Sequence, residues 1–313
     1  MYVYEAGQRD MRDRAATHRS ILSYLIEKRK MEMLMSRKIL TGRGVGVAIL
    51  DTGIYPHIDF DTRIVVFQDF IGGRKRPYDD NGHGTHVAGL ILGSGKGSAG
   101  KYAGAACQSH AAALKVLDKR GNGKVQDVLK ALRWIRENGR ICGIRVINIS
   151  VGTIGNGTRN SHQLIQGVEE LWDEGYVIVT AAGNMGPAPG SITAPGSSRK
   201  VITVGSSDLL EGEEGISGSG PTSECVCKPD VVAPGARIMS CAPGGRGGTY
   251  AAKSGTSMST PQVAGAIALM LEKEPELTNV EIKMLLRESA RDLGYDRNRQ
   301  GWGLFQKEKF LEM

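Results

Sequence analysis

Gly255-Thr256-Ser257-Met258-Ser259-Thr260-Pro261 leads into an apolar run from Val263 to Leu271. The stretch places one serine between a glycine-marked loop and the start of a long helix whose composition predicts burial. A serine hydroxyl becomes a good nucleophile when an adjacent base takes its proton and backbone N–H groups bind the developing oxyanion. Serine and threonine before an apolar helix also serve as N-caps. Ser257 alone therefore leaves catalysis and helix capping both open.

Two further apolar runs end in polar side chains. Val45–Leu50 reads as a buried parallel strand and is followed by Asp51-Thr52-Gly53, while 177–182 reads as a second buried strand followed by Gly183-Asn184. Parallel α/β sheets form their sites at the carboxyl ends of the strands. We therefore expect a carboxylate from Asp51 and an amide from Asn184 at one sheet edge.

The rest of the chain alternates strand and helix patterns. We expect helices near 83–93, 124–138, 162–174, 257–273 and 278–290, and strands near 45–50, 111–117, 145–150, 176–182, 200–205 and 230–232. Strands separated by helices predict βαβ units. The fold class is therefore α/β, a doubly wound, mostly parallel sheet with helices on both faces.

Four motifs, taken together, resemble those of the subtilisin-like serine proteases. They are DTGI at Asp51–Ile54, NGHGTHVAG at Asn81–Gly89, AAGN at Ala181–Asn184 and GTSMSTP at Gly255–Pro261. The order Asp, His, Ser is that of subtilisin, and the resemblance runs from about residue 35 to the C-terminus. It is strongest to bacterial members made without a signal peptide.

The resemblance implies a role for each motif residue. Ser257 would be the nucleophile, and His83, the first histidine of HGTH, the general base; His86 would be a packed structural histidine. Asp51 would orient the His83 ring, and Asn184 with the Ser257 N–H would form the oxyanion hole. The implied activity is a serine endopeptidase that works through an acyl-enzyme on polypeptide substrates.

The same resemblance places the primary specificity pocket. Its walls would be Ser150-Val151-Gly152, which would also bind extended peptide backbone, and Ala181-Ala182-Gly183. These small residues leave room for a large side chain, and Met185 puts an apolar group at the rim. We therefore expect large apolar residues on the acyl side of the cleaved bond.

The chemistry implied by the resemblance needs no cofactor, and structural calcium is left open. Asp59 matches a calcium ligand of the family. The loop 93–100 lacks the family's asparagine, however, and carries a lysine. A calcium shell takes six or more oxygens, and the sequence does not supply that set.

The N-terminus differs from the rest of the chain. We expect a helical extension at 1–30 and a catalytic domain at 31–313, with an apolar stripe at Ile21, Leu22, Leu25 and Ile26. The segment is too short for the folding propeptide of secreted relatives. Two interpretations stay open: a helix packed on the domain, or an accessory segment that inhibits the enzyme or is self-cleaved.

Composition excludes several other classes. The net charge is +7, yet the basic residues are dispersed and not interleaved with aromatic ones, which argues against nucleic-acid binding. No apolar stretch is long enough to span a membrane, and no secretory signal is visible. Five cysteines without framework spacing, Cys225-Val226-Cys227 included, indicate free thiols and a cytoplasmic location. The sequence gives no indication of the oligomeric state.

Two competing functions remain. One is a catalytically silent relative that acts as a regulatory or binding module; the presence of all four chemical residues argues against it. The other is a different Ser-His-Asp hydrolase such as an esterase, and the GTSM context of Ser257 differs from the GxSxG elbow of those enzymes.

Overall fold

A computed structural model describes residues 39–152, 158–211, 215–245 and 249–313. Residues from Leu40 onward form one compact unit. The expected N-terminal helical extension and its apolar stripe lie outside the described residues, so both interpretations of that segment stay predictions.

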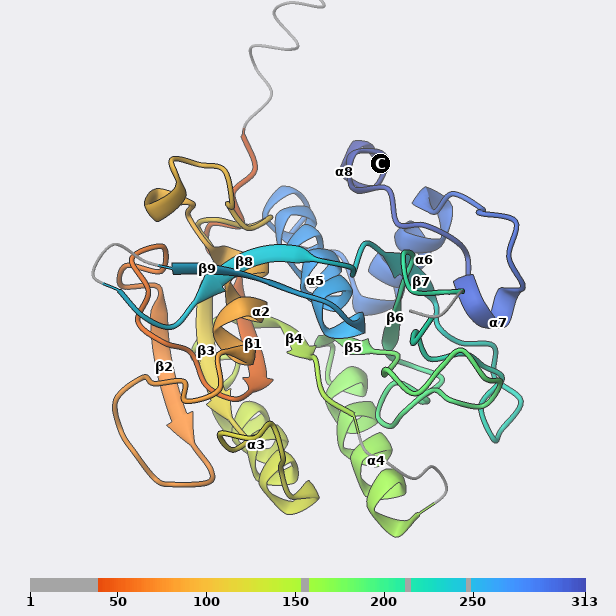
Figure 1. Cartoon of the computed structure of the whole chain (residues 1–313), viewed down its shortest axis with the longest axis horizontal. Coiled ribbons are helices and arrows are strands. Elements are labelled where there is room, and N and C mark those ends of the chain that lie inside the picture. Colours follow the sequence, from red (N-terminus) through yellow and green to blue (C-terminus); the bar gives the residue numbers. More distant parts are fainter. Residues whose placement is uncertain (1–38, 153–157, 212–214, 246–248) are drawn as a thin grey trace, which may run out of the picture. The chain divides into compact units, whose positions relative to one another are not determined.

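The core of this unit is a parallel sheet of seven strands in the order β2-β3-β1-β4-β5-β6-β7 (Figure 1). The residues of its central strands are nearly all buried, as the continuous apolar runs predict. The strands are β1 Gly46–Asp51, β2 Ile64–Asp69, β3 His110–Lys115, β4 Ile144–Ile149, β5 Val177–Ala181, β6 Ile202–Ser206 and β7 Val231–Ala233.

Helices cover both faces of the sheet. Helix α2 (His83–Leu92) packs against α5 (Thr256–Lys273) over one face, and α5 also contacts β4, β5 and β6. Helices α3 (Val125–Asn138) and α4 (Arg159–Asp173) pack together on the opposite face (Figure 1). From β1 the chain goes to β2 and β3 on one side of that strand, and then crosses to β4 and the later strands on its other side. The expected doubly wound α/β fold is confirmed.

The change of winding direction lies between β1 and β4, which are adjacent in the sheet. Ligand sites of open α/β sheets form at such a point, outside the carboxyl ends of the strands. Asp51 ends β1, and Ser150 follows β4 directly. The topology therefore brings two of the expected site segments side by side.

Several elements were not expected from the sequence. Edge strand β2 and the antiparallel hairpin of β8 (Ile238–Ala242) and β9 (Thr249–Lys253) were missed, because their strands are only partly buried. The structure also adds η1 Lys96–Ser98, α7 Arg297–Gln300 and α8 Lys307–Glu312. Helix α6 (Asn279–Ser289) begins as expected, with a capping box between Thr278 and Glu281. No helix of the described residues has the length and apolarity to cross a membrane.

Candidate active site

The end of β1 holds a buried carboxylate against a histidine ring. Asp51 Oδ1 lies 2.7 Å from His83 Nδ1 and also accepts the Thr52 N–H at 2.7 Å. Its Oδ2 is buried and accepts no hydrogen bond from a described residue. Among the described residues, the Asp51 carboxylate is therefore stabilised by hydrogen bonds from the His83 ring and from the Thr52 N–H. This contact fixes the proton on Nδ1 and leaves Nε2 of a neutral ring free to act as a base.

A second carboxylate positions the start of α2, where His83 lies. Asp79 accepts the Gly82 N–H and the Thr52 hydroxyl on Oδ1, and the N–H and hydroxyl of Thr85 on Oδ2. The Thr52 hydroxyl in turn accepts the Gly84 N–H at 2.9 Å. A side chain at Gly84 would overlap the Gly53 carbonyl oxygen. The glycine therefore lets the helix start approach β1 closely enough for the Asp51–His83 contact.

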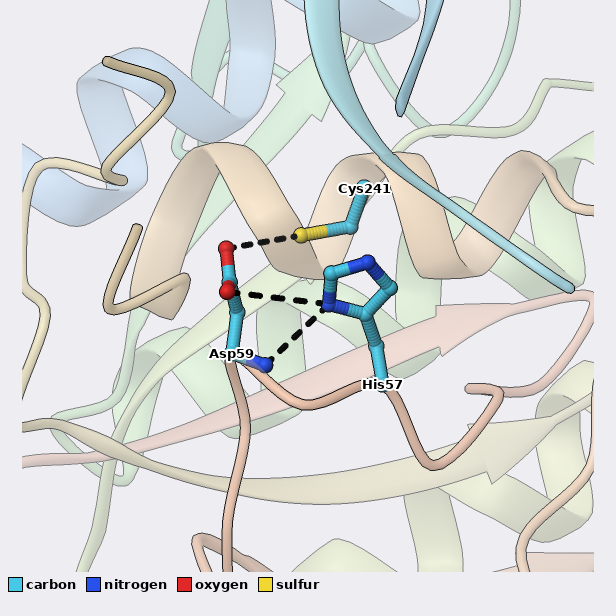
Figure 2. Close-up of side chains that lie close together, drawn as sticks. All are labelled: His57, Asp59 and Cys241. Carbon is cyan, nitrogen blue, oxygen red and sulfur yellow. Dashed lines mark hydrogen bonds and ion pairs between the residues drawn. The ribbon is translucent and has the colours of Figure 1, made fainter. Parts of the chain in front are cut away.

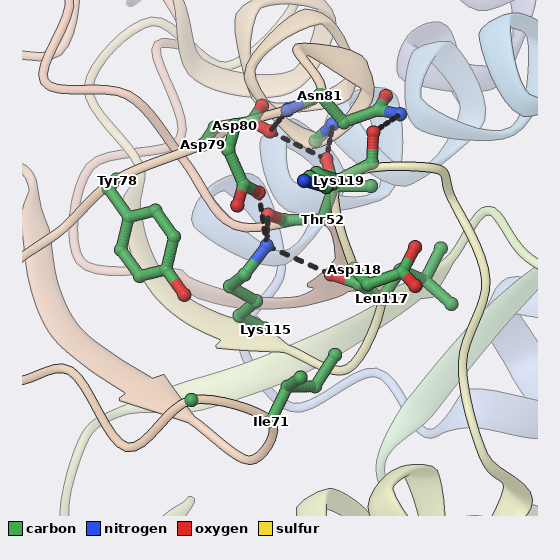
Figure 3. Close-up of polar contacts among 12 residues, drawn as sticks. Thr52, Ile71, Tyr78, Asp79, Asp80, Asn81, Lys115, Leu117, Asp118 and Lys119 are labelled. Carbon is green, nitrogen blue, oxygen red and sulfur yellow. Dashed lines mark hydrogen bonds and ion pairs between the residues drawn. The ribbon is translucent and has the colours of Figure 1, made fainter.

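A buried lysine holds the same strand end from the other side. Figure 3 shows Lys115 at the end of β3, with its Nζ donating to the Thr52 carbonyl at 2.5 Å and to Asp80 Oδ1 at 2.8 Å. Its side chain is 1 % exposed, and Nζ lies 4.9 Å from the centroid of the Tyr78 ring. Lys115 thus connects β3 to the residue after Asp51 and to the loop before His83. The sequence pattern placed Lys115 only within the strand expected near 111–117.

The two histidines of HGTH occupy opposite environments. Burial would lower the pKa of His83, but the charge and hydrogen bond of Asp51 outweigh it and raise the pKa above its ordinary value. His86 is fully buried, and its Nε2 lies 2.9 Å from the Ile238 carbonyl and 3.0 Å from the Ala251 carbonyl. Burial lowers the pKa of His86 to about 4. His86 is therefore a neutral ring that bridges the β8–β9 hairpin, and only His83 faces the cleft.

Ser257 lies in the first turn of α5 and lines the same cleft as His83. Its hydroxyl donates to the Ser150 carbonyl oxygen at 2.8 Å, and no hydrogen bond joins it to His83 in the described structure. Catalytic hydrogen bonds are often loose in unliganded enzymes and tighten when substrate is bound. The structure thus brings the two residues to one cleft without forming their contact.

The side-chain amide of Asn184 has a fixed orientation. Its Oδ1 accepts both the N–H of Thr256 at 3.0 Å and the Thr256 hydroxyl at 3.1 Å. Because a backbone N–H can only donate, the oxygen must face Thr256, and the NH₂ group is turned the other way. Gly255 has a φ of +135°, and a Cβ there would lie 3.0 Å from Asn184 Nδ2. A glycine at 255 is therefore needed for the amide to lie beside the start of α5.

The cleft has a volume of about 750 Å³ and contains most of the expected pocket residues. Ser150, Val151 and Gly152 line one wall, and Ala181 and Gly183 line the other. Ala182 does not line the cleft: its side chain is fully buried, because successive residues of an extended segment face opposite sides. Met185 lies in the cleft lining and is 58 % exposed, as expected of a rim residue.

Other parts of the lining were missed from the sequence. They are the segment Thr193-Ala194-Pro195, the loop after β3, and apolar side chains of α3 and α4, among them Val125, Val128 and Leu164. The apolar spacing of α3 predicts a buried stripe but not which part of it faces a cleft.

Asp59 does not fit a calcium site. Its Oδ1 accepts the Gly97 N–H at 2.8 Å, and its Oδ2 accepts the Gly95 N–H at 3.2 Å and the Tyr250 hydroxyl at 2.9 Å. Calcium requires surrounding oxygens with free lone pairs. The loop that would supply them turns N–H groups toward the carboxylate instead.

His57, Asp59 and Cys241, which we call the Asp59 cluster, are buried together (Figure 2). A histidine, a carboxylate and a thiol are also ligands of softer metals. However, His57 Nδ1 accepts the Asp59 N–H at 3.1 Å, and the Cys241 thiol donates to Asp59 at 3.5 Å. Burial raises the pKa of that thiol well above its ordinary value. The cluster is therefore a closed set of hydrogen bonds.

The family model described as "Subtilase family" matches residues 42–303. The chain belongs to the subtilase family. Members of this family are serine endopeptidases. The chain is 40 % identical to "Serine protease AprX" of Bacillus subtilis over 281 residues, which cover 82 % of this chain and 63 % of AprX. It is 38 % identical to "Subtilisin Savinase" of Lederbergia lenta over 269 residues, which cover 86 % of this chain and 91 % of that protein.

A solved structure has the same fold. The "crystal structure of a cold adapted subtilisin-like serine proteinase" matches with a TM-score of 0.68 and 31 % identity, over 86 % of this chain and 89 % of that one. The match to AprX covers less than two thirds of that protein, whereas the match to Subtilisin Savinase covers nearly the whole of its length.

Proposed function

We propose that this subtilase hydrolyses peptide bonds through an acyl-enzyme formed on Ser257. His83 Nε2 takes the proton of the Ser257 hydroxyl as Oγ attacks the scissile carbonyl carbon, and then gives that proton to the leaving amine. A water molecule attacks the ester in the same way and releases the acid product. Asp51 keeps the His83 ring in the required tautomer and stabilises the imidazolium.

The oxyanion of each tetrahedral intermediate is bound by Asn184 Nδ2 and the Ser257 N–H. What carries the proposal is the joint geometry of the cleft: the 2.7 Å contact of Asp51 with His83, and an Asn184 amide oriented by Thr256, both beside Ser257. Donors fixed before reaction stabilise developing charge without a reorganisation cost. No observation favours the silent-module alternative.

We also propose a preference for large apolar side chains on the acyl side. The space between Ser150–Gly152 and Ala181–Gly183 is lined by small residues, and the exposed apolar Met185 lies at its rim. Neither wall carries a carboxylate that would pair with a basic side chain.

The test uses chromogenic peptides that end in Phe, Leu, Ala or Lys before the scissile bond. We expect turnover that is highest for Phe and Leu and absent in Ser257→Ala. Ser254→Ala is the matched control, because Ser254 is exposed and only accepts the Arg237 N–H. Equal turnover by Ser257→Ala would overturn the mechanism, and a preference for Lys would overturn only the pocket assignment.

We propose further that stability does not depend on calcium at Asp59. The hydrogen bonds to Asp59 take the place of a cation. Melting temperatures in EDTA and in millimolar calcium should coincide. A rise in melting temperature that grows with calcium concentration and disappears in Asp59→Asn would contradict this proposal.

All five cysteines are unpaired, which supports a reducing compartment such as the cytoplasm.

A further inference from the structure

The described residues that line the cleft carry positive side chains and no negative ones. Besides the titratable ring of His83, the cleft is lined by the cationic side chains of Arg120 and Lys124, and by no carboxylate of the described residues. The undescribed stretch 153–157 contains no acidic residue either. Both cations are exposed, and neither side chain has a hydrogen-bond or ion-pair partner among the described residues. They are therefore available to a bound molecule.

In the loop after β3, the carboxylate of Asp118 accepts hydrogen bonds from its own loop. Asp118 accepts the Arg120 N–H at 2.8 Å and the Asn122 N–H at 2.9 Å. These hydrogen bonds from backbone N–H groups lower the pKa of Asp118. The carboxylate therefore stays charged and faces its own loop. Residues 118–124 still carry an excess of positive charge, with Lys119, Arg120 and Lys124 against one carboxylate.

The position of this loop relates it to one side of the scissile bond. The pocket for the acyl-side residue lies between Ser150–Gly152 and Ala181–Gly183, and Leu117, Arg120 and Val125 line the same cavity. An extended peptide advances about 3.3 Å per residue. The residues that precede the scissile bond would therefore run toward the loop that holds Arg120 and Lys124.

We propose that Arg120 and Lys124 select substrates with acidic side chains among the few residues that precede the large apolar residue at the cleavage site. This inference rests on the proposed endopeptidase function and names its substrate class: acidic, extended polypeptide segments. Each cation is exposed, so each interaction is modest and sensitive to salt.

The experiment measures kcat/KM for a peptide series with a constant apolar residue before the scissile bond. Each of the three preceding positions in turn carries Glu, Gln or Lys. At one or more of them we expect the order Glu above Gln above Lys, with Glu over Lys by about tenfold at low salt. The ratio should fall toward one in about 1 M NaCl, where the Debye length is about 3 Å.

Variants identify the source of the preference. The double variant Arg120→Gln, Lys124→Gln should lose the Glu-over-Lys ratio, and Arg120→Glu, Lys124→Glu should invert it. Arg133→Gln is the matched control, since Arg133 lies on the same helix as Val125 but lines a separate groove with α4, and its ratio should equal that of the wild type.

The outcomes separate the two proposals. Cleavage of the Gln peptides without charge preference, or a preference that survives in the double Gln variant, would overturn the acidic-substrate inference and leave the protease intact. A preference confined to positions after the scissile bond would also overturn it. Absence of cleavage of every peptide by folded protein would instead reject the proposed function.

Discussion

His83 and His86 lie three positions apart in α2, yet they differ in almost every physical respect. His83, at the helix start, pairs with Asp51, is about one quarter exposed, and has a raised pKa. His86 is fully buried beneath β8 and β9, with two carbonyls on one nitrogen and a pKa of about 4. One ring is placed to accept and return a proton; the other stays neutral and connects two segments of the fold.

The surroundings of each imidazole, rather than the residue type, decide what the ring does. An adjacent carboxylate stabilises the charged ring at position 83. Carbonyl oxygens and apolar packing hold the ring at position 86, and burial disfavours its charge. Each of the following predictions tests one part of this difference.

The largest expected effect is on catalysis. His83→Ala, assayed on protein that remains folded, should lower kcat by about 10⁴-fold or more, because nucleophile and base act as one unit. His86→Ala, assayed below its own melting temperature, should retain kcat within a few-fold. Loss of catalysis in the His86 variant together with a working His83 variant would reverse the assignment.

The next effect concerns the charge that forms when His83 takes its proton. Asn184→Leu keeps the volume of the side chain but removes the donor, and should lower kcat by about 10²–10³-fold. KM should change little, because the donor acts on the oxyanion and not on the ground-state carbonyl. A variant that raised KM alone would show that Asn184 binds substrate rather than the transition state.

The effect at position 86 is on stability. His86→Ala removes a buried ring and its hydrogen bond to the hairpin, and should lower the free energy of unfolding by about 2–4 kcal/mol. Urea denaturation at neutral pH measures this loss. A fall below about 0.5 kcal/mol would show that the hairpin does not depend on the ring.

The stability contributed by His86 also depends on pH. The unfolded histidine binds a proton below about pH 6.5, whereas the folded ring stays neutral to about pH 4. The unfolded state thus binds more protons in this window, so stability falls as pH drops through it, by at most about 3 kcal/mol. His86→Leu should remove this part of the acid sensitivity. An identical pH dependence in wild type and variant would contradict the neutral ring.

The smallest expected effect is on the pKa of His83. The charge of Lys253 lowers the pKa of His83, so Lys253→Gln should raise that pKa further. Because the base must be neutral, the acid limb of kcat/KM against pH should move to higher pH in the variant. High salt should reduce the difference. A shift to lower pH would mean that Lys253 does not act on His83 through its charge.

Much of this site was predictable from the chain, but not the features that separate the two histidines. Apolar runs located β1 and β5, and the residues that follow them gave Asp51 and Asn184. The β8–β9 hairpin has half-buried strands without a clear alternation. Its carbonyls reach His86 across more than 150 positions of the chain, and no local pattern encodes such a contact.

The same limit applies to Ala182 and to Asp59. A motif placed Ala182 in the pocket wall, whereas the direction of its Cβ, set by the backbone, turns it into the core. Asp59 matched a calcium position, yet the amides of Gly95 and Gly97 are directed at it. In both cases the residue type is compatible with the expected role, and the orientation of neighbouring groups decides against it.

Labelling with a serine-directed fluorophosphonate probe, followed by peptide mapping, tests directly whether His83 activates Ser257. We expect a single adduct on Ser257, formed at similar rates in wild type and folded His86→Ala and at least about 10³-fold more slowly in His83→Ala. An adduct on another residue, or rapid labelling of Ser257 in the absence of His83, would contradict it.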